Sequence, residues 1–408
     1  MIDRRILMQL MGAAWLSACS NGDNQAASRM KIVVVGAGIV GASIAYHLSK
    51  LGVAVTIIDK YGPATQTSKG TFAWINATWA KQPRSYHGLN QEGVSGWLGL
   101  QRDLNLPIKW GGSLEWFDGT ERQKRLKTQI DEQIEWGEDA RMVTGKTLGE
   151  LEPHIDFTNV SSAAYSGNDG AVDPVLATLA LLKGAQAHGA VIKYPCELLD
   201  MSFVSGQLQS VETNLGTIAA DKVILATGAA PDMAERFAQT PLPQRSTPGV
   251  IVITKPLPPL LNRIVSAPGV HMHQRLDGRI VLGEQSGAPD NDAHMMRLKR
   301  RPITFPMPEL AEQHFSRILT IAKKFVPKIG TATLESAHIG WRPLPVDGHP
   351  VLGFSPSRPD VYLAVMHSGV SLAPIVGQVV AQEVTTANQN PQLAQYRPDR
   401  IFKRVKRY

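Results

Sequence analysis

Short runs of β-branched apolar residues mark where the folded part of this chain begins. Residues 31–35 read Lys-Ile-Val-Val-Val, with no alternation of polar positions, which predicts a strand buried on both faces of a parallel sheet. The segment Gly36-Ala37-Gly38-Ile39-Val40-Gly41 follows, and residues 42–51 then have a helical pattern. A second strand is predicted at 53–58, and it ends at Asp59. This order predicts a βαβ unit at the start of an α/β fold.

Further strands are expected well downstream of this unit. Two alternating runs on either side of Ser205-Gly206 predict a hairpin. An apolar run before Ala226-Thr227-Gly228-Ala229-Ala230 predicts a strand that turns tightly on small residues. The complete set of these later elements is strands at 198–203, 208–213, 222–225, 249–253, 279–282 and 361–365, and a helix over 372–385. No internal repeat is visible, which argues against a solenoid or a propeller.

The glycine-rich segment has the spacing of a dinucleotide-binding turn. Gly36 suits the tight turn, Gly38 lets backbone approach a pyrophosphate, and Gly41 allows the helix to pack closely on the strand. The helix N-terminus supplies N–H groups to phosphates. Asp59 is placed to accept hydrogen bonds from a ribose diol, which disfavours NADP. These residues predict a dinucleotide site but do not separate FAD from NAD.

Additional motifs make the assignment narrower. They are Thr65-Gln66-Thr67-Ser68, Gly170-Ala171-Val172-Asp173-Pro174, the Ala226-Thr227-Gly228 turn, and Gly340-Trp341-Arg342-Pro343 followed by Asp347-Gly348. Together with the βαβ fingerprint, they resemble the D-amino-acid-oxidase family, which includes glycine oxidase, sarcosine oxidase and D-amino-acid dehydrogenases. The resemblance covers about residues 31 to 386.

This resemblance implies an α/β fold that is α+β in part. A Rossmann-like FAD-binding domain would be discontinuous, and a mixed antiparallel sheet would form the substrate domain. The expected divisions are 1–29 for a signal peptide and tether, 30–80, 150–235 and 336–390 for the FAD domain, 81–149 and 236–335 for the substrate domain, and 391–408 for a basic tail.

The resemblance also implies hydride transfer from the substrate α-carbon to the N5 atom of FAD. Arg342 is then the candidate carboxylate clamp, with a structural salt bridge as the alternative. His367 would bind substrate or flavin or simply cap a helix, and Gly369 would let backbone N–H groups approach the flavin. The full expected cofactor-binding set is Gly36, Ala37, Gly38, Ile39, Val40, Gly41, Asp59, Lys60, Thr67, Ser68, Thr227, Gly228, Gly340, Arg342, Gly369, Val370, Ser371 and Leu372.

Two departures from the family pattern limit what can be carried over. Glycine oxidase has a second arginine before its last helix, where this chain has His-Ser-Gly-Val at 367–370, so glycine is not specifically indicated. Some relatives bind FAD through cysteine or histidine, but the segment 70–76 has neither, so non-covalent FAD is expected. Within that segment Trp74 would line the flavin site or pack the core. His271 and His273 alternate at strand spacing and would face the substrate cavity or solvent, and no metal site is expected.

The charge distribution bears on possible partners, and the N-terminal segment bears on where in the cell the protein is found. The net charge is +7, and part of it lies in the runs 297–301 and 403–407, which lack interleaved aromatics, so no nucleic-acid partner is expected. Arg4-Arg5, the apolar run 6–16 and Leu16-Ser17-Ala18-Cys19 have the order of a bacterial signal peptide with a lipobox, in which Cys19 is lipidated. The twin arginines resemble an export signal for folded proteins. We expect a membrane-anchored lipoprotein on the periplasmic side, or a cytoplasmic protein if translation starts at Met30.

The favoured function is therefore FAD-dependent oxidation of a small amine or amino acid, with oxygen or a membrane quinone as the electron acceptor. One alternative is an FAD monooxygenase or another FAD enzyme reduced by NAD(P)H. The other is a surface-tethered flavin-binding protein without amine oxidation.

Overall fold

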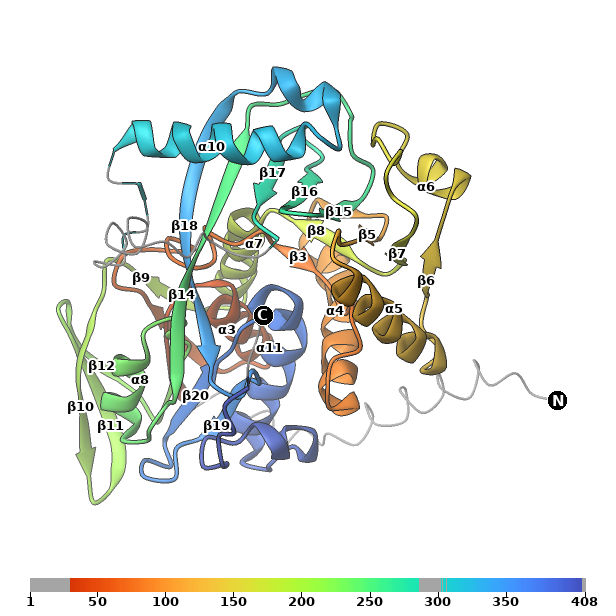
Figure 1. Cartoon of the computed structure of the whole chain (residues 1–408). Helices are drawn as coiled ribbons and strands as arrows, with labels where there is room; N and C mark the ends of the chain where they lie inside the picture. Colours follow the sequence, from red (N-terminus) through yellow and green to blue (C-terminus); the bar gives the residue numbers. More distant parts are fainter. Residues whose placement is uncertain (1–29, 286–301, 303, 306, 406–408) are drawn as a thin grey trace.

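The computed structural model describes residues 30–285, 302, 304–305 and 307–405. The structure contains two large sheets. The long paired strands β14 (Gln244–Thr254) and β18 (Leu334–Pro345) belong to the second sheet and extend from it toward the first (Figure 1). These two strands pair antiparallel from Gln244 opposite Pro345 to Thr254 opposite Leu334.

The first sheet has six strands. Their order is β19 (Val351–Phe354), β20 (Val361–Val365), β13 (Lys222–Leu225), β1 (Lys31–Val35), β2 (Ala54–Ile58) and β9 (Val191–Lys193). All neighbours are parallel except β19 and β20. The predicted strands at 31–35 and 361–365 are confirmed to the residue, and the one at 53–58 begins one position later.

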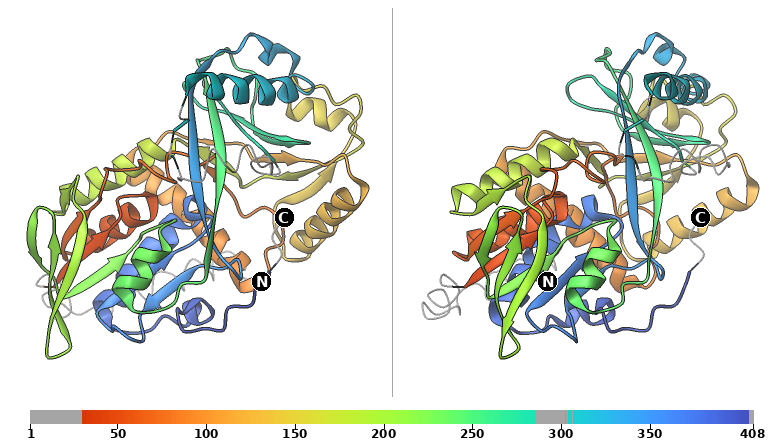
Figure 2. Two further views of the ribbon diagram at one scale, coloured as in Figure 1. Left: turned by 60° about the vertical axis from the view of Figure 1, so that its left-hand side comes forward. Right: turned by 90° about the vertical axis from the view of Figure 1, so that its left-hand side faces the viewer.

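Both faces of this sheet are covered. Ile32 and Val34 point to a core shared with α3 (Ile39–Lys50), α7 (Pro174–Ala187) and α11 (Gly369–Thr386). Val33 and Val35 point the other way, to α8 (Pro231–Ala238) and to the small sheet of β10 (Leu198–Val204), β11 (Gln207–Thr213) and β12 (Gly216–Ala219). Burial on both faces explains why β1 has no polar alternation. The predicted hairpin turns at Ser205 and Gly206, which both have positive φ, and it projects away from α10 (Figure 2).

The second sheet has eight strands. Their order is β18, β14, β17 (Ile280–Gly283), β16 (Val270–Gln274), β15 (Ile264–Ala267), β5 (Ser113–Glu115), β7 (Ala163–Ser166) and β6 (Ala140–Val143). Only β15 and β5 pair in parallel, so the expected mixed antiparallel sheet is confirmed. Helix α10 (Pro308–Ala322) covers one face of this sheet. Its Phe315, Ile318 and Ala322 share a core with sheet residues that include Val252 and Met272.

The remaining described elements are a further small sheet, three helices and two 3₁₀ turns. A three-stranded sheet combines β3 (Trp74–Ile75), β8 (Gly170–Val172) and β4 (Ile108–Trp110). The other helices are α4 (Arg84–Leu104), α5 (Thr120–Glu135) and α6 (Lys146–Leu151), with short 3₁₀ turns η1 (Pro327–Thr331) and η2 (Pro391–Tyr396). Helix α4 lies against α11, because the Trp97 indole donates to the Val370 carbonyl at 2.8 Å.

Strand pairing refines the expected domain divisions, whose boundaries stay a prediction. Strands β7 and β18 fall in ranges expected for the FAD domain, yet both pair in the eight-stranded sheet. The start of the expected basic tail is packed rather than solvated. Arg397 binds Glu383 through two hydrogen bonds, of 2.5 and 2.9 Å, and Arg400 Nε donates to Asp347 at 2.8 Å. Lys403 and Arg404, beyond this packed segment, are exposed.

Candidate functional site

The glycine-rich turn lies where β1, α3 and β13 meet. Gly36 has φ of +108°, and a Cβ placed there would lie 2.4 Å from the Ala226 carbonyl oxygen. A Cβ at Gly41 would lie 1.9 Å from the Gly36 carbonyl oxygen. Any side chain would therefore push backbone against backbone at both positions. The structure thus gives these two glycines the turn and packing roles that the sequence suggested.

The N-terminus of α3 is met by a side chain from another loop. The helix begins after Gly38, which has no side chain of its own to cap it. The Ser68 hydroxyl accepts from the Ile39 N–H at 3.0 Å, and it lies 3.1 Å from where a Gly38 Cβ would be. The segment Thr65–Ser68 therefore reaches the helix N-terminus from a separate loop. The N–H groups and the positive dipole end at a helix N-terminus favour phosphate binding, so a phosphate site here stays a prediction.

Asp59 lies at the end of β2, beside this turn. One carboxylate oxygen accepts from the Ala37 N–H, and the other accepts from the Tyr61 and Gly62 N–H groups, all at 2.8 Å. A carboxylate has lone pairs to spare after three such bonds, so a ribose contact stays a prediction. Lys60, by contrast, is directed to the surface, where its Nζ lies 2.8 Å from Oε1 of Glu197.

The Ala226-Thr227-Gly228 turn faces the same region from β13. The Thr227 hydroxyl oxygen is buried and has no hydrogen-bond partner among the described residues. Gly228 has φ of +56°, and its carbonyl accepts from Gln244 at 3.1 Å. A buried polar atom without a partner is costly, so it suits a site completed by a ligand. The helix N-terminus, the glycine cradle and this hydroxyl together fit the phosphate and ribose end of FAD.

The start of α11 meets the start of α3. A Cβ at Gly369 would lie 3.1 Å from a methyl of Val40, so two helix N-termini lie side by side. The Ser371 hydroxyl accepts from the Asn76 N–H at 3.0 Å and donates to the Trp74 carbonyl at 3.2 Å. Leu372 is fully buried, and its N–H donates to the Ser368 carbonyl. The structure thus brings the predicted segments 36–41 and 369–372 together.

His367 lies two residues before Gly369, the first residue of α11. Its Nδ1 lies 3.1 Å from the hydroxyl of Ser368, and in the described part of the chain this N-cap residue makes no capping hydrogen bond through its own side chain. Both alternatives for His367, a helix-capping role and contact with substrate or flavin, stay predictions.

Arg342 lies on β18, on the face of the eight-stranded sheet opposite to α10, which we call the inner face. Its guanidinium crosses Gly249 on the neighbouring strand, because a Cβ there would lie 2.7 Å from Nη2 and 3.0 Å from Cζ. Gly340, two residues earlier, packs against Gly70, where a Cβ would meet the Gly70 carbonyl at 2.3 Å. The Thr67 hydroxyl also donates to the Trp341 carbonyl at 2.6 Å. The predicted Thr67 and Gly340 therefore fasten β18 to the loop that reaches α3.

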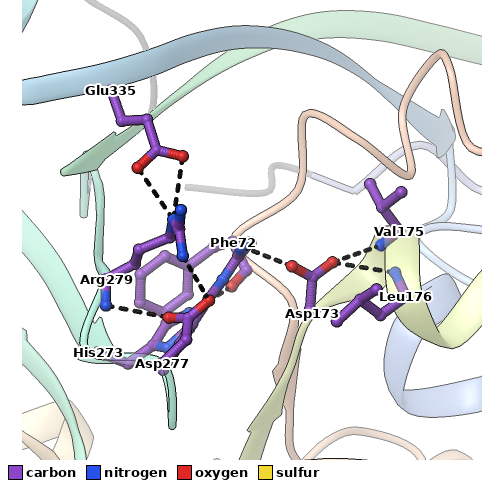
Figure 3. Close-up of polar contacts among 9 residues, drawn as sticks. Phe72, Asp173, Val175, Leu176, His273, Asp277, Arg279 and Glu335 are labelled. Atoms are coloured by element: carbon purple, nitrogen blue, oxygen red, sulfur yellow. Dashed lines mark hydrogen bonds and ion pairs between the residues drawn. The ribbon is translucent and has the colours of Figure 1, made fainter. Parts of the chain in front are cut away.

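His271 and His273 lie on the same inner face. The His271 ring centroid is 5.5 Å from Phe72 and 5.9 Å from Trp74. Burial, followed by the charge of Arg342, lowers the pKa of His271 well below its usual 6.5. His273 is buried, and its Nε2 lies 3.0 Å from the Phe72 carbonyl oxygen, so the solvent-facing alternative is wrong for it (Figure 3). The described residues contain no group of three or more metal-ligating side chains.

The Gly170–Pro174 motif ties the two sheets together. Asp173 caps α7 by accepting from the Val175 and Leu176 N–H groups at 2.9 and 3.1 Å (Figure 3). Its other oxygen binds Arg275, in the turn between β16 and β17, at 2.6 Å. This ion pair fixes the hairpin that carries both histidines against the FAD domain.

Some features of the site were not anticipated. Phe72 and Gly249 belong to it, and so do two buried carboxylates at Glu115 and Asp169. The expected signal peptide and tether at 1–29, including Cys19, and the basic run 297–301 lie outside the described residues. Within the described part of the chain, no helix is long and apolar enough to cross a membrane.

Known proteins share this arrangement. The sequence model of the DAO family, FAD dependent oxidoreductases, matches residues 31–383. Glycine oxidase from Geobacillus kaustophilus is 25% identical over 375 residues, which are 87% of this chain and 93% of that protein. The structure of L-proline dehydrogenase from P. horikoshii is similar with a TM-score of 0.78 at 24% identity, covering 90% of this chain and 96% of that one.

An L-amino acid deaminase from Proteus myxofaciens, in complex with anthranilate, has a TM-score of 0.78 at 19% identity and covers 92% of this chain and 94% of its own. At these identities the two solved structures show a common fold only. The family match spans nearly all the described residues, including the glycine-rich turn, Arg342 and the start of α11. The chain therefore belongs to the DAO family of FAD-dependent oxidoreductases.

Proposed function

We propose that this enzyme oxidises the C–N bond of a small amino acid or amine, using non-covalent FAD as hydride acceptor. The observation that carries the proposal is the position of Arg342, whose guanidinium lies over Gly249 on the inner face of the eight-stranded sheet. That face also holds His271, next to the Trp74 strand that is tied to the start of α11.

Arg342 would bind the substrate carboxylate. A guanidinium presents a planar fork of donors that matches a carboxylate with two parallel hydrogen bonds. Because Gly249 has no side chain, the guanidinium can lie flat against the sheet and turn one edge outward. A carboxylate held by both oxygens has a fixed direction, and so does the neighbouring α-C–H bond. Such orientation is a large part of the rate in a reaction of this kind.

His271 would contribute as a neutral ring. Its lowered pKa means that it is uncharged at neutral pH, so it does not add to the positive charge of Arg342. A neutral imidazole both donates and accepts one hydrogen bond, which suits an amine nitrogen. FAD, when bound, supplies the hydride acceptor, and the N-terminus of α11 would turn backbone N–H groups toward it.

The reaction class is supported by the relatives, among which are a glycine oxidase and an L-proline dehydrogenase. The anthranilate in the Proteus myxofaciens deaminase combines a carboxylate, an amine and a flat ring. We propose anthranilate as a probe for the site of this chain, because its carboxylate matches Arg342 and its ring matches the aromatic side chains nearby.

We further propose that the protein is an exported lipoprotein anchored at Cys19, and that it passes electrons to a membrane quinone or to oxygen. The support is the order of Arg4-Arg5, the apolar run 6–16 and the lipobox in the sequence. A tether would keep the enzyme beside a membrane, where a quinone is within reach.

A substrate panel tests the proposed reaction. The FAD-loaded protein is mixed with D- and L-amino acids, N-methylated amino acids and simple amines, together with an artificial electron acceptor. We expect at least one to be consumed, with release of ammonia or an amine and formation of a carbonyl product. If none is consumed by protein that carries FAD, the proposal is wrong.

A further inference from the structure

Two buried carboxylates lie behind the aromatic side chains of the site. Glu115 on β5 and Asp169, just before β8, each expose 2% of their surface. Glu115 shares a sheet face with the site residues, because it pairs with Ser266 on β15, and Ser266 pairs with His271 on β16. Its chain neighbours Leu114 and Trp116 point instead into the core under α10. Glu115 therefore belongs to the same face as Arg342, and Asp169 reaches that face through its hydrogen bond with the Ser113 hydroxyl.

Each carboxylate holds a tryptophan by its indole N–H. Asp169 Oδ2 accepts from Trp74 Nε1 at 2.9 Å and also from the hydroxyls of Ser113 and Thr78. Glu115 accepts from Trp79 Nε1 and, at 2.7 Å, from the Ser266 hydroxyl. An indole has a single donor, so the acceptor's position sets the plane of the ring.

The two rings continue the aromatic lining of the site. Trp74 and Trp79 meet edge to face with centroids 5.6 Å apart. Trp74 also meets Phe72 and His271 edge to face or nearly so, at 6.4 and 5.9 Å. The rings therefore form an unbroken row in space, from Trp79 through Trp74 to His271.

Packing alone gives no reason for acids at these positions. A buried carboxylate is costly to desolvate, and its hydrogen bonds here come from neutral hydroxyls and indoles. Lys81 is the nearby cation, and its Nζ lies 5.5 Å from the Trp79 ring centroid. Burial raises the pKa of Glu115 to about 7 and raises that of Asp169 as well, while the Lys81 charge acts in the opposite direction. Apolar residues would avoid this cost but would leave both indole N–H groups without their acceptors.

We propose that Asp169 and Glu115 are positioning residues, which fix the indoles of Trp74 and Trp79 as the wall against which the substrate side chain packs. This inference rests on the proposed function, because it takes the face that carries Arg342 as the substrate site. Arg342 recognises the carboxylate shared by all amino acids, and the indole wall selects among their side chains. The preferred substrates therefore have an apolar or aromatic group beyond the α-carbon.

The test compares two carboxylates that differ in the group the wall would contact. Acetate has a carboxylate and only a methyl group, whereas anthranilate adds a flat ring. Dissociation constants are measured from the change in flavin absorbance when each acid is added to the FAD-loaded protein. The variants are Trp74→Phe, which removes the N–H donor, Asp169→Leu, which removes the acceptor, and both together. Trp116→Phe is the matched control, since that buried indole N–H has no hydrogen-bond partner among the described residues and its ring packs on Phe157 and Phe325.

We expect each single variant to weaken anthranilate binding about tenfold and to change acetate binding less than about twofold. The double variant should bind as either single variant does, because both remove one interaction. Trp116→Phe should leave both constants unchanged. Glu115→Leu with Trp79→Phe repeats the comparison on the second pair, should Asp169→Leu fail to fold.

Three results would overturn the inference. Unchanged anthranilate binding in Trp74→Phe and Asp169→Leu would show that the indoles do not form the wall. Equal loss for acetate and anthranilate would assign the carboxylates a general structural role. Both of these leave the proposed function intact. If the wild-type protein binds neither acid, the carboxylate site itself is wrong, and the proposed function fails together with the inference.

Discussion

Gly249→Ala is a small change that separates the position of Arg342 from its charge. The added Cβ would lie 2.7 Å from Nη2, 3.0 Å from Cζ and 3.1 Å from Nε of Arg342. Ordinary contact begins at about 3.5 Å, so the guanidinium must retreat by roughly 0.8 Å. The obstructing atoms are the end of a flexible side chain, and Gly249 lies in a strand without a positive φ, so alanine fits the backbone. The free energy of unfolding should change by less than about 1 kcal/mol.

The effect on catalysis should be much larger. A displacement of about 1 Å in a positioning group costs on the order of 100-fold in rate, so we expect the rate of flavin reduction by substrate to fall about 10- to 100-fold. The assay is anaerobic stopped-flow absorbance of the FAD-loaded protein, with FAD content measured on the same sample. Gly99→Ala on α4 is the control, because among the described residues nothing outside the surrounding helix backbone lies within 4 Å of its Cβ position. If Gly249→Ala is reduced with wild-type rate and affinity, Arg342 does not orient the substrate.

Three further predictions concern the cofactor turn, a buried acid and the N-terminus. Gly41→Ala would place a Cβ 1.9 Å from the Gly36 carbonyl oxygen and should yield colourless protein; retained FAD absorbance would contradict this. Burial raises the pKa of Glu115 to about 7 from 4.5, so the native state keeps a proton that the unfolded chain loses, and stability falls between these pH values by about 3 kcal/mol. Glu115→Gln should remove that loss. The free energy of unfolding in urea of the variant, relative to that of the wild type, should therefore rise by about 3 kcal/mol from pH 4.5 to pH 8. If the two proteins show the same pH dependence of this free energy, Glu115 does not have the raised pKa. Cys19→Ala should release the protein from membranes or leave it uncleaved, whereas soluble wild-type protein with Met1 intact would exclude a lipoprotein.

The local elements of the FAD domain could be predicted because each rests on neighbouring residues. The apolar run 31–35 is buried on both faces, and the Ser205-Gly206 turn closes its hairpin at positive φ. The glycine-rich turn was predictable for the same reason, since Gly36 and Gly41 contact each other across a short stretch of chain. In these cases the contacting residues are close together in the sequence, so their spacing along the chain determines their arrangement in space.

The rest depends on contacts between distant segments, which spacing does not encode. Gly249 is part of the site only because β14 pairs with β18 and puts it beneath Arg342. Asp169 lies between short strands with no motif of its own, and its indole partner Trp74 is far away in sequence. Lys60 follows Asp59 directly but binds Glu197 on the surface instead of facing the turn. Resemblance to a family indicated Arg342, but only the fold shows what surrounds it.

Anaerobic reduction of the bound flavin tests the central claim most directly. The FAD-loaded protein is titrated without oxygen with amino acids and amines, and separately with NADH and NADPH, while the absorbance of oxidised flavin is followed. We expect at least one amino acid or amine to bleach the flavin, and we expect NADH and NADPH not to bleach it. Bleaching by NADH or NADPH alone would show an FAD enzyme of a different reaction class, and no bleaching by any compound would show a flavin-binding protein without this activity.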